Sequence, residues 1–158
     1  MLMKISNQNP TGLLIPPPVY YIVSLLMGIG LNYFFPTKML PTGLGLTIAI
    51  LLIAISIILV IPVIIKFKTS NTPFDVRKSA TVLITDGPYK YSRNPSYLSL
   101  TLLYLGFGFL LNNLWILLLV VVILPIINYL VIQREETNLE KIFGEEYRLY
   151  KASVRRWL

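Results

Sequence analysis

Four apolar stretches, separated by short polar or proline-containing breaks, dominate the pattern of the chain. They run over Val19–Phe35, Leu44–Ile65, Pro95–Leu111 and Leu114–Ile132. A membrane-crossing helix needs about 20 apolar residues, so the second and fourth stretches fit well and the other two lie at the short limit. Asn112-Asn113 is the only polar break between the last two stretches, which predicts a tight antiparallel hairpin. The pattern predicts an all-α integral membrane protein with about four transmembrane helices.

A different pattern follows the fourth stretch. Apolar residues recur there at helical spacing, opposite charged ones, and include Leu139, Ile142, Phe143, Tyr147 and Tyr150. We therefore expect the fourth helix to continue out of the bilayer as a cytoplasmic C-terminal helix. Gly144 interrupts the pattern and predicts a bend.

The composition indicates that much of the protein surface faces a lipid bilayer rather than water. The chain has 158 residues, of which 55% are hydrophobic and only 13% charged, whereas soluble domains carry about 25% charged residues. Of its 14 Lys and Arg, all but Lys38 fall in the N-terminal segment, the 66–93 loop and the tail. An even number of spans places these three segments on one side, so the positive-inside rule predicts a multi-pass protein with both termini cytoplasmic. This distribution favours contact with membrane lipids over nucleic acid.

The residue inventory excludes several kinds of chemistry. The chain has no Cys and no His. Disulfides, thiolate or imidazole zinc sites, Ser-His-Asp triads and cysteine nucleophiles are therefore excluded. We expect no metal site.

Polar and aromatic residues gather where the third stretch begins. Asn94-Pro95 predicts a helix start, with Asn94 as the N-cap and Pro95 at the first helical position. The free N–H groups of such a helix end favour an anion. Tyr89 and Tyr97 flank this start, as does Arg93. Alternatively, the same residues form an aromatic belt at the membrane surface, with the arginine in contact with lipid phosphate.

Two adjacent carboxylates, Glu135 and Glu136, follow the fourth stretch. Burying charged groups beside an apolar run is costly, and such groups are usually functional. In the simpler alternative, both side chains reach water and Arg134 pairs with one of them. Neighbouring helix positions lie about 100° apart, so one carboxylate can turn inward while the other points out. The predicted hairpin brings them close to Asn94 and Tyr97. The resulting pocket suits a zwitterionic, nucleotide-like ligand.

The segments GPYKYSRNPSYL and REETNLEKIFGEEYRLYKASVRRWL resemble the motifs of the isoprenylcysteine carboxyl methyltransferase family and its bacterial relatives. The resemblance implies an integral-membrane methyltransferase that uses S-adenosylmethionine. It also implies one domain over 1–158, with two N-terminal spans in 1–66 and the cofactor-binding part in 67–158. The implied cofactor-binding residues are Thr81, Val82, Leu83, Ile84, Tyr89, Asn94, Pro95, Ser96, Tyr97 and Glu135. Arg93 and Arg134 are the candidates on the substrate side.

Two departures from the family pattern bear on the acceptor. Asn94 stands where the family has a histidine, and an asparagine still caps a helix and forms hydrogen bonds. Val131 stands where the prenylcysteine enzymes have an arginine for the substrate carboxylate. The resemblance therefore favours a lipid-like or hydrophobic acceptor over the carboxyl group of an isoprenylcysteine.

Two other functions remain open from the sequence. The first is an NADPH-dependent membrane reductase of sterol-like enones, whose 2′-phosphate site would use Lys66, Lys68, Arg77 and Lys78. The second is a non-enzymatic structural membrane protein, in which the same motifs are turns and aromatic belts.

Overall fold

A computed structural model of the chain describes residues 11–13, 15–75 and 78–158, and this described part contains helices and connecting turns but no strand. In chain order the elements are α1 (Pro17–Phe34), α2 (Thr42–Thr69), the 3₁₀ turn η1 (Gly87–Lys90), α3 (Pro95–Leu110), α4 (Leu114–Ile126), the π-helical segment η2 (Ile127–Ile132), α5 (Gln133–Phe143) and α6 (Glu145–Ser153). The all-α prediction is confirmed for these residues. Lys4 and Arg77, which belong to the predicted basic segments, lie outside them.

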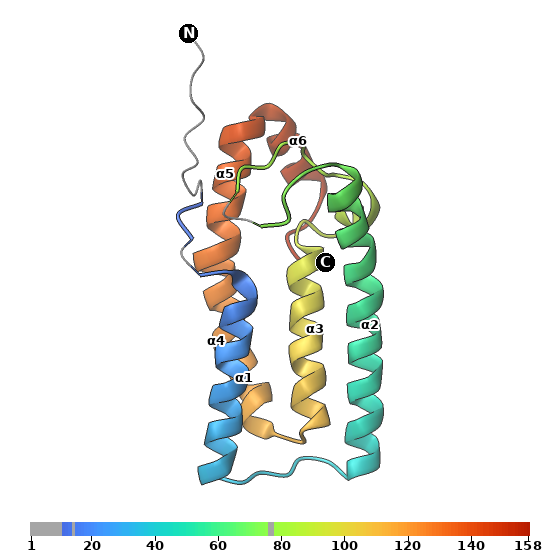
Figure 1. Cartoon of the computed structure of the whole chain (residues 1–158), viewed down its shortest axis with the longest axis vertical. Helices are drawn as coiled ribbons and strands as arrows, with labels where there is room; N and C mark the ends of the chain where they lie inside the picture. The colour runs from blue at the N-terminus through green and yellow to red at the C-terminus, as the bar shows by residue number, and fades with distance from the viewer. Residues whose placement is uncertain (1–10, 14, 76–77) are drawn as a thin grey trace.

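The long helices stand side by side as an upright bundle (Figure 1). α2 packs along α3, and α1 packs along α4, with α3 and α4 in contact with each other. The predicted hairpin between α3 and α4 is present. Its two asparagines tie it to the 35–41 connection and to α1, because Asn112 Oδ1 accepts the N–H of Met39 at 3.1 Å and Asn113 Nδ2 donates to the carbonyl of Gly28 at 3.1 Å.

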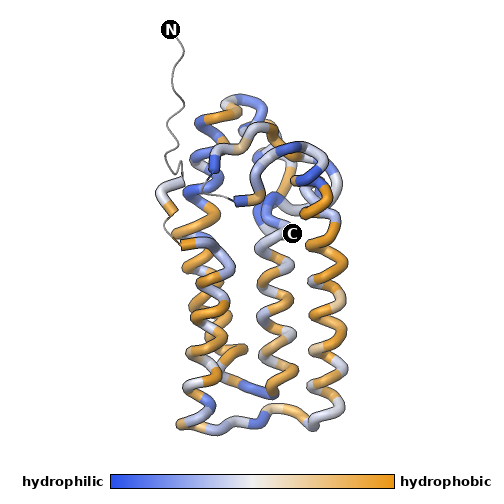
Figure 2. Tube along the Cα trace, viewed as in Figure 1, coloured by the Kyte–Doolittle hydropathy of each residue, from blue (hydrophilic) through white to orange (hydrophobic). Residues whose placement is uncertain are grey.

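Two helices of the described part are long and apolar enough to cross a membrane, Thr42–Thr69 and the continuous run Leu114–Phe143. α3 is also apolar but shorter. Orange, apolar residues cover the length of the bundle, and the blue, polar residues gather at one end and in the loops at the other (Figure 2). The structure therefore supports two spans by length and composition.

The last long helix is continuous but irregular. Pro125 lies inside α4, where it removes one backbone donor, and the wider turn η2 follows it directly. Rearranged hydrogen bonds of this kind are common beside such interruptions. α5 then extends the helix beyond the apolar run as predicted, up to Gly144. The bend there is also confirmed, because Gly144 has φ +55°, a conformation that favours glycine.

Candidate functional site

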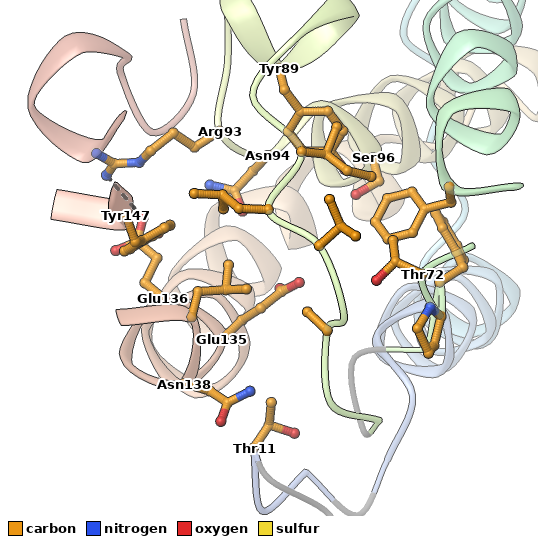
Figure 3. Close-up of a pocket in the computed structure, with 18 of the residues that line it drawn as sticks. Thr11, Thr72, Tyr89, Arg93, Asn94, Ser96, Glu135, Glu136, Asn138 and Tyr147 are labelled. Carbon is orange, nitrogen blue, oxygen red and sulfur yellow. Dashed lines mark hydrogen bonds and ion pairs between the residues drawn. The ribbon is translucent and has the colours of Figure 1, made fainter. Parts of the chain in front are cut away.

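A pocket lies at the polar end of the bundle, between the start of α3, the 67–84 loop and the helices α5 and α6 (Figure 3). It contains about 820 Å³ of space not filled by protein atoms, including the part open to solvent. The pocket is open to solvent and is lined by residues from each of these segments.

The Glu135 carboxylate reaches from α5 into this pocket (Figure 3). Tyr97, in the first turn of α3, donates its hydroxyl hydrogen to Glu135 Oε2 at 2.8 Å. Tyr97 is only 4% exposed, so its ring is fixed by packing and the hydrogen bond in turn fixes the carboxylate. The other carboxylate oxygen, Oε1, has no hydrogen-bond partner in the part of the chain that the structure describes. The pocket thus contains an oriented acceptor group.

Aromatic rings form another wall. Phe67 contacts Phe74 edge-on, with ring centroids 5.0 Å apart, and contacts Tyr89 at 6.2 Å. The Tyr150 hydroxyl donates to the carbonyl of Tyr89 at 2.8 Å and holds this turn in place. Burial, together with the charge of Glu135, raises the pKa of Tyr89 above its usual value of 10, so its hydroxyl stays neutral. The wall is therefore aromatic and apolar, with one neutral hydroxyl.

Glu136, another lining residue of the pocket, forms a buried ion cluster. Arg93 Nη2 lies 2.9 Å from Glu136 Oε1, and Arg156 Nη2 lies 2.7 Å from Oε2. The side chains of Glu136 and Arg93 are only 7% and 9% exposed. The expectation that one of the two carboxylates points out is therefore wrong, as is the alternative that both reach water. The reason is that the chain's C-terminal end folds back and supplies Arg156.

The start of α3 differs from the prediction in one respect. The helix begins at Pro95 as expected, but the side chain of Asn94 does not cap it. The Asn94 amide nitrogen instead donates to the carbonyl of Arg156 at 3.0 Å. The first-turn amides of Ser96 and Tyr97 thus receive no side-chain cap from Asn94. Both residues line the pocket.

Most residues predicted to form the site lie together in the pocket. Its lining includes Val82, Leu83, Ile84, Tyr89, Arg93, Asn94, Ser96, Tyr97 and Glu135. Thr81 does not line it. Its N–H instead donates to Thr72 Oγ1 at 3.1 Å, which joins the two sides of the loop.

Three other residues named from the sequence lie away from the pocket lining. Pro95 is buried at the start of α3. Arg134 is exposed, lines a separate shallow hollow, and donates to the carbonyl of Gly12 at 3.5 Å rather than to either neighbouring carboxylate. Val131 is fully buried in the core. An arginine at that position would therefore have no room without repacking.

The sequence did not identify several lining residues. They include Phe67, Thr72, Phe74, Lys78, Asn138, Tyr147 and Tyr150. Tyr147 and Tyr150 were predicted only as an apolar helix face, and that face is the one that closes the pocket. Within the described ranges, no group of three or more Asp, Glu, His or Cys is arranged to hold a metal.

Comparison with known proteins bears directly on this site. A family model described as phospholipid methyltransferase matches residues 44–146, which is more than half of the chain. The chain belongs to the phospholipid methyltransferase family. This family lies within the isoprenylcysteine carboxyl methyltransferase group of membrane methyltransferases, so the resemblance identified in the sequence is confirmed.

An uncharacterized protein of Haemophilus influenzae is 50% identical to the chain over 62 residues, which cover 39% of this chain and 98% of that protein. No solved structure matches the chain. Members of the phospholipid methyltransferase family are membrane methyltransferases that generally use S-adenosylmethionine and act on lipid-like substrates. The matched region includes most of the pocket, from Phe67 to Leu139.

Proposed function

We propose that this protein transfers a methyl group from S-adenosylmethionine to a lipid-like acceptor and that the pocket around Glu135 binds the cofactor. The observation that carries the proposal is the Glu135 carboxylate, oriented by Tyr97 and directed into the pocket. S-adenosylmethionine presents ribose hydroxyls and an amine to such an acceptor. When bound, its sulfonium supplies an electrophilic methyl group.

The other walls of the pocket fit the remaining parts of the cofactor. The aromatic rings of Phe67 and Tyr89 offer flat apolar surfaces to an adenine ring and attract a cationic centre. The uncapped first turn of α3 offers N–H groups to a carboxylate. Val82, Leu83 and Ile84 supply apolar side chains to the lining.

Methyl transfer by displacement depends mainly on positioning and on exclusion of water. A chain without His or Cys can provide both. Arg93 is bound to Glu136, so we assign it to holding the site together rather than to the acceptor. Arg134 is exposed on the same end of the bundle and remains our candidate for contact with an acceptor headgroup.

We also propose the four-span arrangement with both termini in the cytoplasm. Every lining residue of the pocket except Thr11 comes from residues 67–158, which supports the division into two N-terminal spans and a cofactor-binding part. The exposed apolar side chains of α1 and the apolar composition of α3 support their placement in the bilayer. The acceptor would then reach the pocket from the membrane. Methyl-transfer assays with candidate acceptors, a prenylated cysteine among them, identify it.

Calorimetry on the detergent-purified protein tests the cofactor assignment. We expect saturable binding of S-adenosylhomocysteine and no signal from NADPH titrated in parallel. Glu135→Gln should weaken this binding at least about tenfold, since a charged acceptor contributes roughly 1.5–3 kcal/mol. Glu145→Gln is the matched control, because Glu145 is 70% exposed and lies outside the pocket. Binding of NADPH alone would instead establish a reductase.

A further inference from the structure

The buried ion cluster joins three segments that are far apart in the sequence. Glu136 accepts from Arg93 at Oε1, at 2.9 Å, and from Arg156 at both oxygens, at 3.1 and 2.7 Å. The third Arg156 side-chain nitrogen, Nη1, donates to Asn128 Oδ1 on η2 at 3.2 Å. A carboxylate clamped on both oxygens by two planar guanidiniums cannot rotate freely. The cluster therefore fixes the direction of the Glu136 side chain.

Glu136 and Glu135 are adjacent on α5, so fixing one constrains the other. Their side chains leave the helix about 100° apart. Arg93 holds Glu136 from just before α3, and Tyr97 holds Glu135 from the first turn of α3 at 2.8 Å. These two contacts form a double link between α3 and α5. The rotation of α5 that satisfies Glu136 is the one that directs Glu135 into the pocket.

The C-terminal segment completes this link. The Arg93 N–H donates to the carbonyl of Arg155 at 3.0 Å, and Asn94 donates to the carbonyl of Arg156 at 3.0 Å. Arg93 Nη1 also donates to the carbonyl of Lys151, at 2.7 Å, near the end of α6. The end of the chain thus lies against the turn before α3, with the Arg156 side chain inserted toward Glu136. The family match ends at residue 146 and does not include this segment.

We propose that Arg156 is a positioning residue of the cofactor site: through Glu136 it sets the rotation of α5 that directs Glu135 toward the cofactor. Arg156 does not line the pocket itself, so its effect on binding passes through this cluster. The inference rests on the proposed function, since it concerns the same pocket.

The neighbouring Arg155 provides a matched control. Its side chain is exposed, and replacing either arginine by alanine removes the same charge from the same segment. We expect Arg156→Ala to weaken S-adenosylhomocysteine binding about tenfold, and Arg155→Ala to change it less than twofold. Both are measured by calorimetry at a temperature where thermal unfolding shows that each variant is folded. Equal affinities in the two variants overturn the inference.

A double-variant cycle separates positioning from general destabilisation. Tyr97→Phe removes the hydroxyl that holds Glu135. If Arg156 acts through Glu135, the double variant Tyr97→Phe/Arg156→Ala should bind S-adenosylhomocysteine with an affinity close to that of the single variant with the lower affinity. Additive losses mean that Arg156 affects binding by another route, which also overturns the inference.

If Arg156→Ala fails to fold, Arg156→Lys decides, because lysine keeps the charge but cannot grip both carboxylate oxygens in the same way. We expect a several-fold loss in that variant, and unchanged affinity contradicts the inference. If the unaltered protein binds no S-adenosylhomocysteine, the proposed function fails and the inference with it. Binding by the unaltered protein with no effect of Arg156 refutes the inference alone.

Discussion

At the scale of single residues, the pocket shows how neighbouring groups of the same type take different roles. Glu135 has one oxygen bound by Tyr97 and the other open to the pocket, whereas Glu136 has both oxygens bound by arginines. The charge of Glu136 is balanced by its ion pairs, so this carboxylate stabilises the structure. The first retains an open acceptor oxygen and is therefore the one available to a ligand.

Tyr150 links the aromatic wall to α6 and gives a pH-dependent prediction. Burial raises the pKa of Tyr150 to about 12, whereas an unfolded chain has the usual value of about 10. The unfolded state therefore loses this proton first as the pH rises. The free energy of unfolding should be unaffected by Tyr150 ionisation below pH 10 and should fall between pH 10 and about 12.

Thermal unfolding between pH 8 and 12 measures this effect. We expect the midpoint of Tyr150→Phe to fall less steeply at alkaline pH than that of the unaltered protein. At pH 8 the same variant should be less stable by about 1 kcal/mol, because the hydrogen bond to Tyr89 is lost. Tyr91→Phe is the control, since Tyr91 is 76% exposed. Identical slopes in the two variants would contradict the assignment.

At the scale of elements, glycines set how closely the helices approach. A Cβ atom built at Gly28 on α1 would lie 2.6 Å from Ile116 Cγ1 and 3.1 Å from the Ile116 Cα on α4. Two residues further along the same helix, and therefore on a different face of it, Gly30 has open space around it. Small residues at such contacts let backbones pack closely in membrane bundles. The close contact between α1 and α4 therefore depends on the absence of a side chain at Gly28.

This pair of glycines predicts opposite effects of the same substitution. Gly28→Ala should destabilise the protein by about 1–3 kcal/mol, because α1 or α4 must shift. Gly30→Ala should be neutral or stabilising by up to about 1 kcal/mol, because alanine favours the helix. Denaturant or thermal unfolding of the two variants measures the difference. Equal effects would mean that the close approach at Gly28 does not determine packing.

The elements also show what the sequence can predict. The four apolar stretches, the Asn112-Asn113 hairpin and the Gly144 bend are local patterns, and each corresponds to an element of the structure. The meeting of Tyr97 with Glu135 followed from the hairpin, since two antiparallel helices return the chain to the same end. The π-helical turn after Pro125 did not follow, because a proline is compatible with several rearranged turns.

The rest of the site depends on contacts between distant segments. Arg156 reaches Glu136 only because α6 turns back at Gly144 and the last residues lie against the turn before α3. No periodic pattern of apolar residues in the sequence predicts that this segment folds back. For the same reason the sequence assigned Asn94 to capping α3, although the nearby carbonyl of Arg156 takes its side chain instead.

At the scale of the whole molecule, the distribution of charge and apolar surface defines a direction. α5 and α6, which supply part of the pocket lining, lie at one end of the bundle, and the 35–41 connection that contains Lys38 lies at the other (Figure 1). Exposed apolar side chains follow α1 as well as α2, including Ile22, Val23 and Leu26. In water such a surface would be costly, so we expect α1 and α3 to cross the bilayer together with α2 and α4.

The absence of cysteine in the chain makes this topology directly measurable. Single substitutions Lys38→Cys and Glu145→Cys place one thiol at each end of the bundle, in exposed positions outside the pocket. In intact bacterial cells, a membrane-impermeant maleimide should label Lys38→Cys and leave Glu145→Cys unlabelled. Permeabilised cells should label both, which controls for accessibility. Labelling of Glu145→Cys in intact cells would reverse the orientation, and labelling of neither would place the Lys38 loop inside and reject the four-span arrangement.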